Sequence, residues 1–214
     1  MKLQLALDTL SMADSIALTE KVRDYIDIIE IGTPFIMEYG MEAVRNFRKR
    51  FPEKEILADA KIMDAGELES RAAFEAGADY VTVLGVTDIL TVESCVQTAT
   101  KYGKKIVVDM ICVEDIPAKI RQLETAGAHC LAVHTGVDQQ KAGRKPIDDL
   151  RLMKEHCKIA EIFVAGGISL ETIPLYAELS PEVLIVGGGI CSADDPAGQA
   201  MLIYKKIKSV PQNS

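Results

Sequence analysis

The chain has 214 residues, of which 48% are hydrophobic, and a formal net charge of −8. This acidic balance argues against binding to nucleic acid or to a membrane surface, and no apolar run reaches the roughly 20 residues needed to cross a bilayer. The five cysteines are scattered without a CxxC pair, which is typical of a reducing compartment, so we expect a cytoplasmic protein.

Eight short apolar runs follow one another along the chain. Most are continuous rather than alternating in polarity, which is typical of parallel strands covered on both faces. The predicted strands are residues 3–7, 26–31, 56–60, 80–84, 106–110, 130–133, 162–165 and 183–186.

Stretches with helical spacing separate these runs. Ser11 or Asp14 is suited to cap the first predicted helix. Gly77 and Gly127 are suited to follow the third and fourth. The predicted helices include residues 15–23, 41–50, 67–76, 118–125 and 196–207.

Eight strand–helix units without a flexible linker predict a single α/β domain, a (β/α)8 TIM barrel over residues 1–214. The alternative is an open, doubly wound sheet, which usually carries a G-x-G-x-x-G loop after its first strand. Here the residues after the first strand read Asp8-Thr9-Leu10-Ser11. The barrel is therefore favoured.

Ionisable side chains stand at the ends of several predicted strands. In a TIM barrel the active site lies where the strands end and the following loops begin. Asp59 and Lys61 are two residues apart and so share a face of their strand, and a buried charge requires a partner or a metal. The set is Asp8, Glu30, Asp59, Lys61, Asp109 and His134.

Glu30 and Asp59 are the expected metal ligands. Carboxylate donors with few nitrogen or sulfur partners select Mg²⁺ or Mn²⁺ over zinc. The alternative is a network of buried ion pairs without a metal. His134, at the end of the sixth predicted strand, is the expected acid/base residue; the alternative is a histidine with a structural role in the core.

The last two predicted strands run into glycine pairs. Gly166 and Gly167 follow the seventh strand, and Gly187 and Gly188 follow the eighth. Glycine lets backbone N–H groups approach an anion, and the loops after these two strands form the usual phosphate site of this barrel. Glycine also serves in any tight turn, but two pairs at these places predict a phosphorylated small molecule as the ligand.

With these motifs the chain resembles the orotidine 5′-monophosphate decarboxylase superfamily, whose mark is Asp-x-Lys-x-x-Asp on the third strand. Within it, the chain is similar over essentially its whole length to the branch of 3-keto-L-gulonate-6-phosphate decarboxylase and 3-hexulose-6-phosphate synthase. The motifs that carry the resemblance are Leu-Ala-Leu-Asp8, Glu30-Ile-Gly-Thr-Pro34, Asp59-Ala-Lys61-Ile-Met-Asp64-Ala-Gly66, His134-Thr-Gly-Val-Asp138 and Ala165-Gly-Gly-Ile168.

Two details resemble the synthases of that branch rather than its decarboxylases. The decarboxylase pattern has a glutamate where Asp109 stands, and an arginine shortly after the histidine that helps to deliver a proton. Here Thr135 and Gly136 follow His134, and the next arginine is Arg144. The resemblance therefore favours aldol chemistry over decarboxylation.

The implied reaction is a reversible, Mg²⁺-dependent aldol condensation of formaldehyde with D-ribulose 5-phosphate to D-arabino-hex-3-ulose 6-phosphate, through a 1,2-enediolate. By this resemblance, Mg²⁺ (or Mn²⁺) on Glu30 and Asp59 holds the sugar's oxygens. Lys61 adds positive charge beside the enediolate. His134, assisted by Asp109, moves the proton of C1.

The resemblance also implies roles outside this central group. Asp8 is expected to position the sugar hydroxyls, and the two glycine pairs to bind the phosphate. Members of this branch are homodimers in which the second aspartate of the motif, here Asp64, reaches into the partner's active site. We therefore expect a homodimer that acts on a phosphorylated sugar and formaldehyde.

Three alternatives remain at this point. The first is decarboxylation of 3-keto-L-gulonate 6-phosphate on the same scaffold. The second is isomerisation or epimerisation of a sugar phosphate, although an epimerase would be expected to present more metal-binding histidines. The third is a non-catalytic barrel that only binds sugar phosphates, against which the full set of charged residues argues.

Overall fold

The chain folds into a closed barrel of eight parallel strands in chain order, in which β1 pairs with β8. The computed structural model describes residues 1–143 and 145–210, so Arg144 lies outside the described residues. The predicted (β/α)8 barrel is confirmed. The strands are β1 (Lys2–Leu7), β2 (Ile28–Ile31), β3 (Glu55–Ile62), β4 (Tyr80–Leu84), β5 (Lys105–Asp109), β6 (Cys130–His134), β7 (Glu161–Ala165) and β8 (Val183–Val186).

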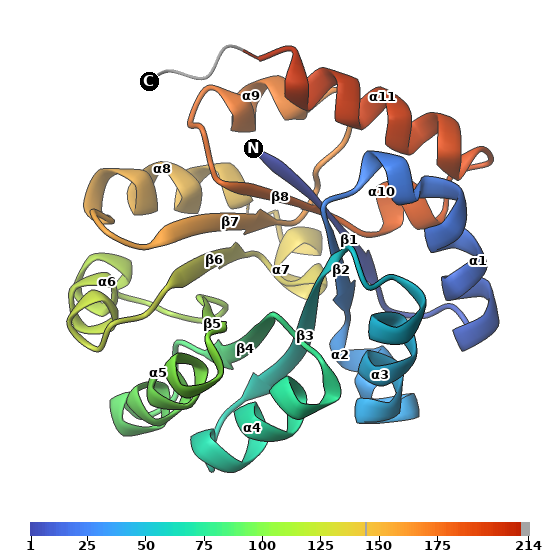
Figure 1. The fold of residues 1–214 in the computed structure, drawn as a ribbon. Coiled ribbons are helices and arrows are strands. Elements are labelled where there is room, and N and C mark those ends of the chain that lie inside the picture. The colour runs from blue at the N-terminus through green and yellow to red at the C-terminus, as the bar shows by residue number, and fades with distance from the viewer. Residues whose placement is uncertain (144, 211–214) are drawn as a thin grey trace.

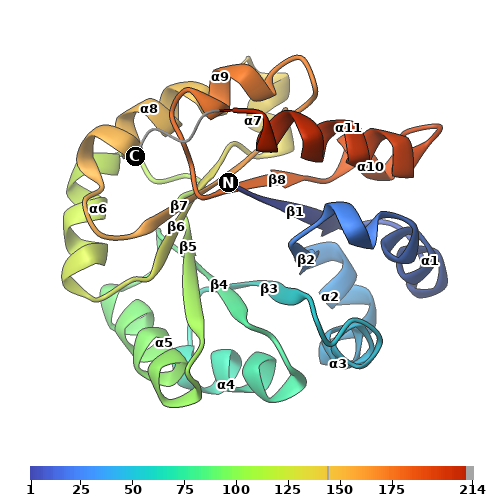
Figure 2. The ribbon, with the colours of Figure 1, turned by 45° about the horizontal axis from the view of Figure 1, so that its top comes forward.

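Helices form a ring outside the strands (Figures 1 and 2). Among the described residues, no helix combines the length and apolar character that a bilayer span requires. The helices are α1 (Met12–Val22), η1 (Arg23–Tyr25, a 3₁₀ turn), α2 (Thr33–Tyr39), α3 (Met41–Arg50), α4 (Gly66–Ala76), α5 (Ile89–Tyr102), α6 (Ile116–Thr125), α7 (Val137–Lys141), α8 (Pro146–His156), α9 (Ile173–Ala177), α10 (Gly188–Cys191) and α11 (Pro196–Lys208).

Helices α1 and α6 begin earlier than their periodicity predicts, and side-chain caps explain both differences. Helix α1 starts directly after Ser11, whose hydroxyl accepts a hydrogen bond from the backbone N–H of Asp14 (3.2 Å). Helix α6 starts directly after Asp115, whose carboxylate accepts from the N–H of Ala118 (2.9 Å). Each cap satisfies a first-turn N–H group that has no partner within the helix.

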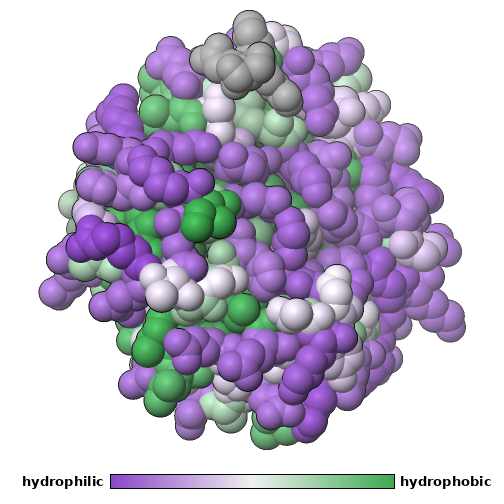
Figure 3. Space-filling view, turned by 60° about the vertical axis from the view of Figure 1, so that its left-hand side comes forward, coloured by the Kyte–Doolittle hydropathy of each residue, from purple (hydrophilic) through white to green (hydrophobic). Residues whose placement is uncertain are grey.

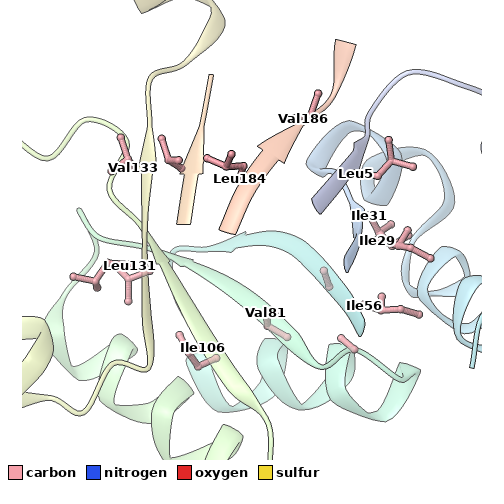
Figure 4. Packing of buried hydrophobic residues seen from close by; sticks show 14 of the residues in the cluster. Leu5, Ile29, Ile31, Ile56, Val81, Ile106, Leu131, Val133, Leu184 and Val186 are labelled. Carbon is pink, nitrogen blue, oxygen red and sulfur yellow. The ribbon is translucent and has the colours of Figure 1, made fainter. Parts of the chain in front are cut away.

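The outward-facing side chains of the strands form the main hydrophobic core beneath the helices. They alternate along each strand with residues that face the barrel interior. Figure 4 shows this layer, with Leu5, Ile29, Ile31, Ile56, Val81, Ile106, Leu131, Val133, Leu184 and Val186 labelled.

The inward-facing side chains fill the barrel from its amino-terminal end. Lys2 pairs with Glu55 (2.6 Å), and Lys105 pairs with Glu161 (2.8 Å). An apolar cluster packs in the barrel interior and fills its amino-terminal part. A cavity can therefore form only at the carboxyl ends of the strands. This inner cluster contains Ile28, Leu57, Tyr80, Val107, Cys130, Ala132, Phe163 and Val183.

The outer surface is mostly hydrophilic on the side that lies to the left in Figure 1. Figure 3 shows this face, where hydrophobic residues form separate patches among polar ones. This pattern is normal for a folded protein surface.

Candidate active site

A cavity of about 930 Å³ opens at the carboxyl ends of the strands. All strand-end residues selected from the sequence lie on its wall, as do both glycine pairs, whereas Asp64 does not. The predicted residues that line the cavity are Asp8, Glu30, Asp59, Lys61, Asp109, His134, Gly166, Gly167, Gly187 and Gly188.

Asp59 is held by donors from three elements. It projects from β3 and is only 6% exposed. The Thr82 hydroxyl of β4 donates to Oδ1 (2.8 Å), and the Thr33 hydroxyl at the start of α2 lies 2.9 Å from Oδ2. The Lys61 ammonium lies 2.5 Å from the same Oδ2. These contacts fix the orientation of the carboxylate.

Lys61 reaches the cavity through an irregularity in β3. The pairing of β3 with β4 shifts its register between Ala58 and Ile62, and Lys61 has a φ of +48°. A positive φ is uncommon for a residue with a side chain and costs conformational energy. The backbone N–H of Lys61 donates to the Thr82 hydroxyl (2.8 Å). The prediction that Asp59 and Lys61 share a face is confirmed. The strand between them is bulged, however, and does not alternate regularly as predicted.

Asp109 links Lys61 to His134. Its Oδ2 lies 2.8 Å from His134 Nδ1 and 3.4 Å from Lys61 Nζ. Burial acts to raise the pKa of Asp109, but the His134 hydrogen bond and the charges of His134 and Lys61 outweigh it, so the pKa is lowered. Burial acts to lower the pKa of Lys61, but the charges of Asp59 and Asp109 outweigh it, so the pKa is raised. At neutral pH the site therefore contains a carboxylate and an ammonium in contact.

Glu30 extends from β2 into the same cavity and is 8% exposed. The side chain of Gln4 donates from Nε2 to Glu30 Oε2 (2.6 Å). Burial, and then the charge of Asp59, raise the pKa of Glu30 to about 8. A divalent cation held by Glu30 and Asp59 would remove this cost of ionisation, so the pair fits the predicted metal site.

The donor set suits Mg²⁺ or Mn²⁺ better than zinc. Within residues 1–143 and 145–210, no group of three or more His, Cys, Asp and Glu side chains is arranged to hold a metal. Structural and catalytic zinc sites use three or four such ligands. Mg²⁺ is usually held by one or two carboxylates together with water and substrate oxygens, which matches Glu30 and Asp59.

Asp8 follows β1 at the rim of the cavity. Burial, and then the charge of Asp59, raise its pKa above the ordinary value. Its carboxylate occupies the space beside Gly32, where a Cβ atom would lie 2.1 Å from Asp8 Oδ1. The glycine of the Glu-Ile-Gly-Thr-Pro motif therefore makes room for Asp8.

The loop after β7 presents backbone N–H groups. Gly166 and Gly167 have φ values of +106° and +61°, in the region that favours glycine. Their carbonyl oxygens accept hydrogen bonds from Tyr176 Oη (3.3 Å) and Thr172 Oγ1 (3.0 Å). The N–H and C=O of a trans peptide point in opposite directions, so the N–H groups of Gly167 and Ile168 face away from these hydroxyls. In the described part of the chain they donate to no protein acceptor.

The loop after β8 lies against the loop after β7. Gly187 connects β8 to the short helix α10, whose first residue is Gly188. A Cβ atom on the next residue, Gly189, would lie 3.2 Å from the carbonyl oxygen of Ile168. Both predicted glycine pairs are therefore brought together on one part of the cavity wall, as a phosphate site requires.

Asp64 lies outside the cavity, exposed in the loop after β3. The side chains of Met63, Leu68 and Leu90 on this side are all more than half exposed. The Thr87 hydroxyl donates to the carbonyl oxygen of Met63 (2.6 Å), which ties the loops after β3 and β4 together. Asp64 thus belongs to a partly apolar surface beside the site, and its role in a partner's site stays a prediction.

Three polar residues that shape the site were not selected from the sequence. They are Gln4, Thr33 and Thr82, all of which line the cavity. Gln4 and Thr82 interrupt strands that are otherwise largely apolar. A polar residue at an inward position of such a strand is the signal that could have identified both.

Comparison with known proteins finds relatives that match over nearly the full length of the chain. The sequence model of the family described as "Orotidine 5'-phosphate decarboxylase / HUMPS family" matches residues 1–203. A 3-hexulose-6-phosphate synthase from Bacillus subtilis is 45% identical over 207 residues, which cover 97% of this chain and 99% of the relative.

Solved structures show the same relationship in three dimensions. A 3-hexulose-6-phosphate synthase from Salmonella typhimurium superposes with a TM-score of 0.97 at 55% identity, covering 99% of this chain and 100% of the other. A 3-keto-L-gulonate-6-phosphate decarboxylase from Vibrio cholerae superposes with a TM-score of 0.87 at 27% identity, covering 98% of each chain. The predicted resemblance is therefore confirmed.

Proposed function

The chain belongs to the orotidine 5′-phosphate decarboxylase / HUMPS family, and from this premise we propose that it is an aldehyde-lyase that joins formaldehyde to D-ribulose 5-phosphate. The product is D-arabino-hex-3-ulose 6-phosphate, and the reaction is reversible. Relatives named 3-hexulose-6-phosphate synthase, which match over nearly the full length, support this assignment.

The line of contacts from His134 through Asp109 and Lys61 to Asp59 carries the proposal. An aldol reaction of this kind needs a group that takes a proton from carbon, and positive charge beside the oxygen that becomes negative. The line supplies both in one cavity. Asp109 orients the imidazole, and Asp59 and Asp109 together hold the ammonium of Lys61.

Glu30 and Asp59 would hold the divalent cation. When bound, Mg²⁺ supplies positive charge to the carbonyl and hydroxyl oxygens of the sugar. The raised pKa of Glu30 supports this assignment, because it reports two buried carboxylates without sufficient neighbouring positive charge.

Proton transfer falls to His134. Its Nδ1 is engaged by Asp109, so Nε2 is the nitrogen left to take the proton from C1 of D-ribulose 5-phosphate. The electron pair released gives the 1,2-enediolate, beside which Lys61 contributes its charge. C1 then bonds to the carbon of formaldehyde, and the formaldehyde oxygen takes up the proton from His134. All atoms of both substrates remain in the product.

The remaining residues bind and orient the sugar. The N–H groups of Gly167 and Ile168, which donate to no protein acceptor within residues 1–143 and 145–210, would hold the phosphate together with the adjacent loop after β8. Asp8, at the rim, would accept hydrogen bonds from sugar hydroxyls. Binding energy gained at the phosphate then serves to orient the reacting end of the molecule.

A homodimer is part of the proposal. The exposed side chains of Met63, Leu68 and Leu90 lie on the same side as Asp64 and would be covered by a second copy of the chain. Asp64 would then act in the partner's cavity. The cavity of a single chain already contains all the other predicted residues.

Decarboxylation of 3-keto-L-gulonate 6-phosphate is the second candidate, because the decarboxylase from Vibrio cholerae shares the fold. Among the described residues that line the cavity, none is an arginine, and the decarboxylase pattern uses one to deliver a proton. To separate the reactions, the protein is incubated with formaldehyde and D-ribulose 5-phosphate, or with the keto acid, each with Mg²⁺ or EDTA. Turnover of the keto acid alone would refute the proposal.

A further inference from the structure

Gln4 is a fully buried amide in the interior of the barrel. It projects inward from β1 with no exposed surface. Its register partners are Ile28 on β2 and Ile185 on β8. Both belong to or pack against the inner apolar cluster, so an aliphatic side chain would suit this position at least as well as an amide.

The amide of Gln4 is only half satisfied. Its Nε2 donates to Glu30 Oε2 at 2.6 Å, but its Oε1 is buried without a hydrogen-bond partner among the residues that the structure describes. A buried polar atom without a partner costs stability. The apolar surroundings therefore do not account for glutamine here. Within the described part of the chain, the hydrogen bond to Glu30 is the one contact that uses the polar end of this side chain.

We propose that Gln4 is a positioning residue that orients the Glu30 carboxylate for a divalent cation. Because Gln4 engages Oε2, Oε1 of Glu30 is the oxygen left to face a cation in the cavity. Side chains that orient metal ligands typically change metal affinity or activity about 10–100-fold when they are removed. This inference rests on the assignment of Glu30 as a ligand in the proposed function.

Mn²⁺ affinity, measured by electron paramagnetic resonance on protein without substrate, tests the proposal. Gln4→Met keeps the length of the side chain but cannot donate to Glu30, and it should raise the Kd for Mn²⁺ by about tenfold or more. The matched control is Phe163→Leu, which loosens the same inner cluster without removing a polar contact. It should lower the melting temperature and leave the Kd within about twofold of the unmodified value.

Each outcome separates this inference from the metal assignment. An unchanged Kd in Gln4→Met would overturn the role of Gln4 while leaving Glu30 as a ligand. Failure of the unmodified protein to bind Mn²⁺ would overturn the metal assignment, and the role of Gln4 with it. If Gln4→Met does not fold, Gln4→Asn, whose amide is too short to reach Glu30, is expected to show the same loss of affinity.

Discussion

The ammonium of Lys61 lies 2.5 Å from the carboxylate of Asp59, although the two residues are not joined by a regular stretch of strand. Lys61 adopts a φ of +48°, and the register of β3 against β4 shifts around it. The fold therefore accepts backbone strain at the residue that supplies the cavity with its fixed positive charge. Strain that persists at such a place is a mark of a functional site.

Removal of the Lys61 ammonium should impair chemistry more than substrate binding. Lys61→Ala is expected to lower kcat by about 10²–10³-fold, because the charge acts on the oxyanion formed during the reaction. Lys61→Gly is the control for backbone strain: it should lose the same activity but melt at a higher temperature than Lys61→Ala, since glycine adopts a positive φ without cost. Near-normal kcat in both variants would remove Lys61 from the mechanism.

His134 and Asp109 should control exchange of the C1 proton of D-ribulose 5-phosphate. In D₂O without formaldehyde, NMR should show exchange at C1 by the unmodified protein. His134→Gln and Asp109→Asn should each slow it by roughly 10²–10⁴-fold, the usual contribution of a positioned acid/base group. His129→Gln is the matched control, because His129 precedes β6 and its ring accepts a hydrogen bond from Ile106 instead. Rapid exchange in His134→Gln would assign the proton transfer to another residue.

The buried carboxyl group of Glu30 should make stability depend on pH. Its pKa is raised from 4.5 to about 8, so its contribution to stability is present below the ordinary value and is lost as pH rises through about 8. In EDTA, the unmodified protein should therefore lose stability between pH 5 and pH 9 relative to Glu30→Gln. At pH 9 the melting temperatures should have moved apart by roughly 5 °C or more.

The comparison with Glu30→Gln isolates this residue. Burial lowers the pKa of His129, so ionisation of His129 makes stability rise with pH over part of this range. Both proteins contain His129, so this effect cancels in the comparison. Mg²⁺ should restore much of the lost stability at pH 9 in the unmodified protein and not in Glu30→Gln. Parallel melting curves in EDTA would show that Glu30 ionises without cost.

Asp64 should act across the subunit interface. Asp64→Ala is expected to reduce kcat, and a mixed dimer of Asp64→Ala with Asp59→Ala should regain one working site, because each chain supplies what the other lacks. The control is a mixed dimer of Asp24→Ala with Asp59→Ala. Asp24 is exposed in η1, far from the loop after β3. Sedimentation gives the oligomeric state, and a monomer with full activity would exclude this role.

The barrel and most of its site could be predicted because both follow simple rules. Continuous apolar runs predict parallel strands, and the carboxyl ends of those strands meet in one place. Asp59, Asp109 and His134 were therefore expected to converge, and they do. The metal, the substrates and the dimer stay predictions.

Other features depend on contacts between distant parts of the chain. Strand alternation alone does not reveal the bulge at Lys61, whose backbone N–H donates to the hydroxyl of Thr82 on the next strand. The second donor to Asp59, Thr33, comes from α2, a short helix that begins next to Pro34. Gln4 becomes significant only when Glu30 is seen beside it.

Transfer of the formaldehyde carbon to the sugar is the most direct test of the central claim. The protein is supplied with ¹³C-labelled formaldehyde, D-ribulose 5-phosphate and Mg²⁺, and the product is followed by ¹³C NMR. We predict that the label appears at C1 of D-arabino-hex-3-ulose 6-phosphate, and that EDTA or Asp59→Ala abolishes it. Absence of labelled hexulose phosphate from the unmodified protein, with the fold intact and Mg²⁺ present, would contradict the account.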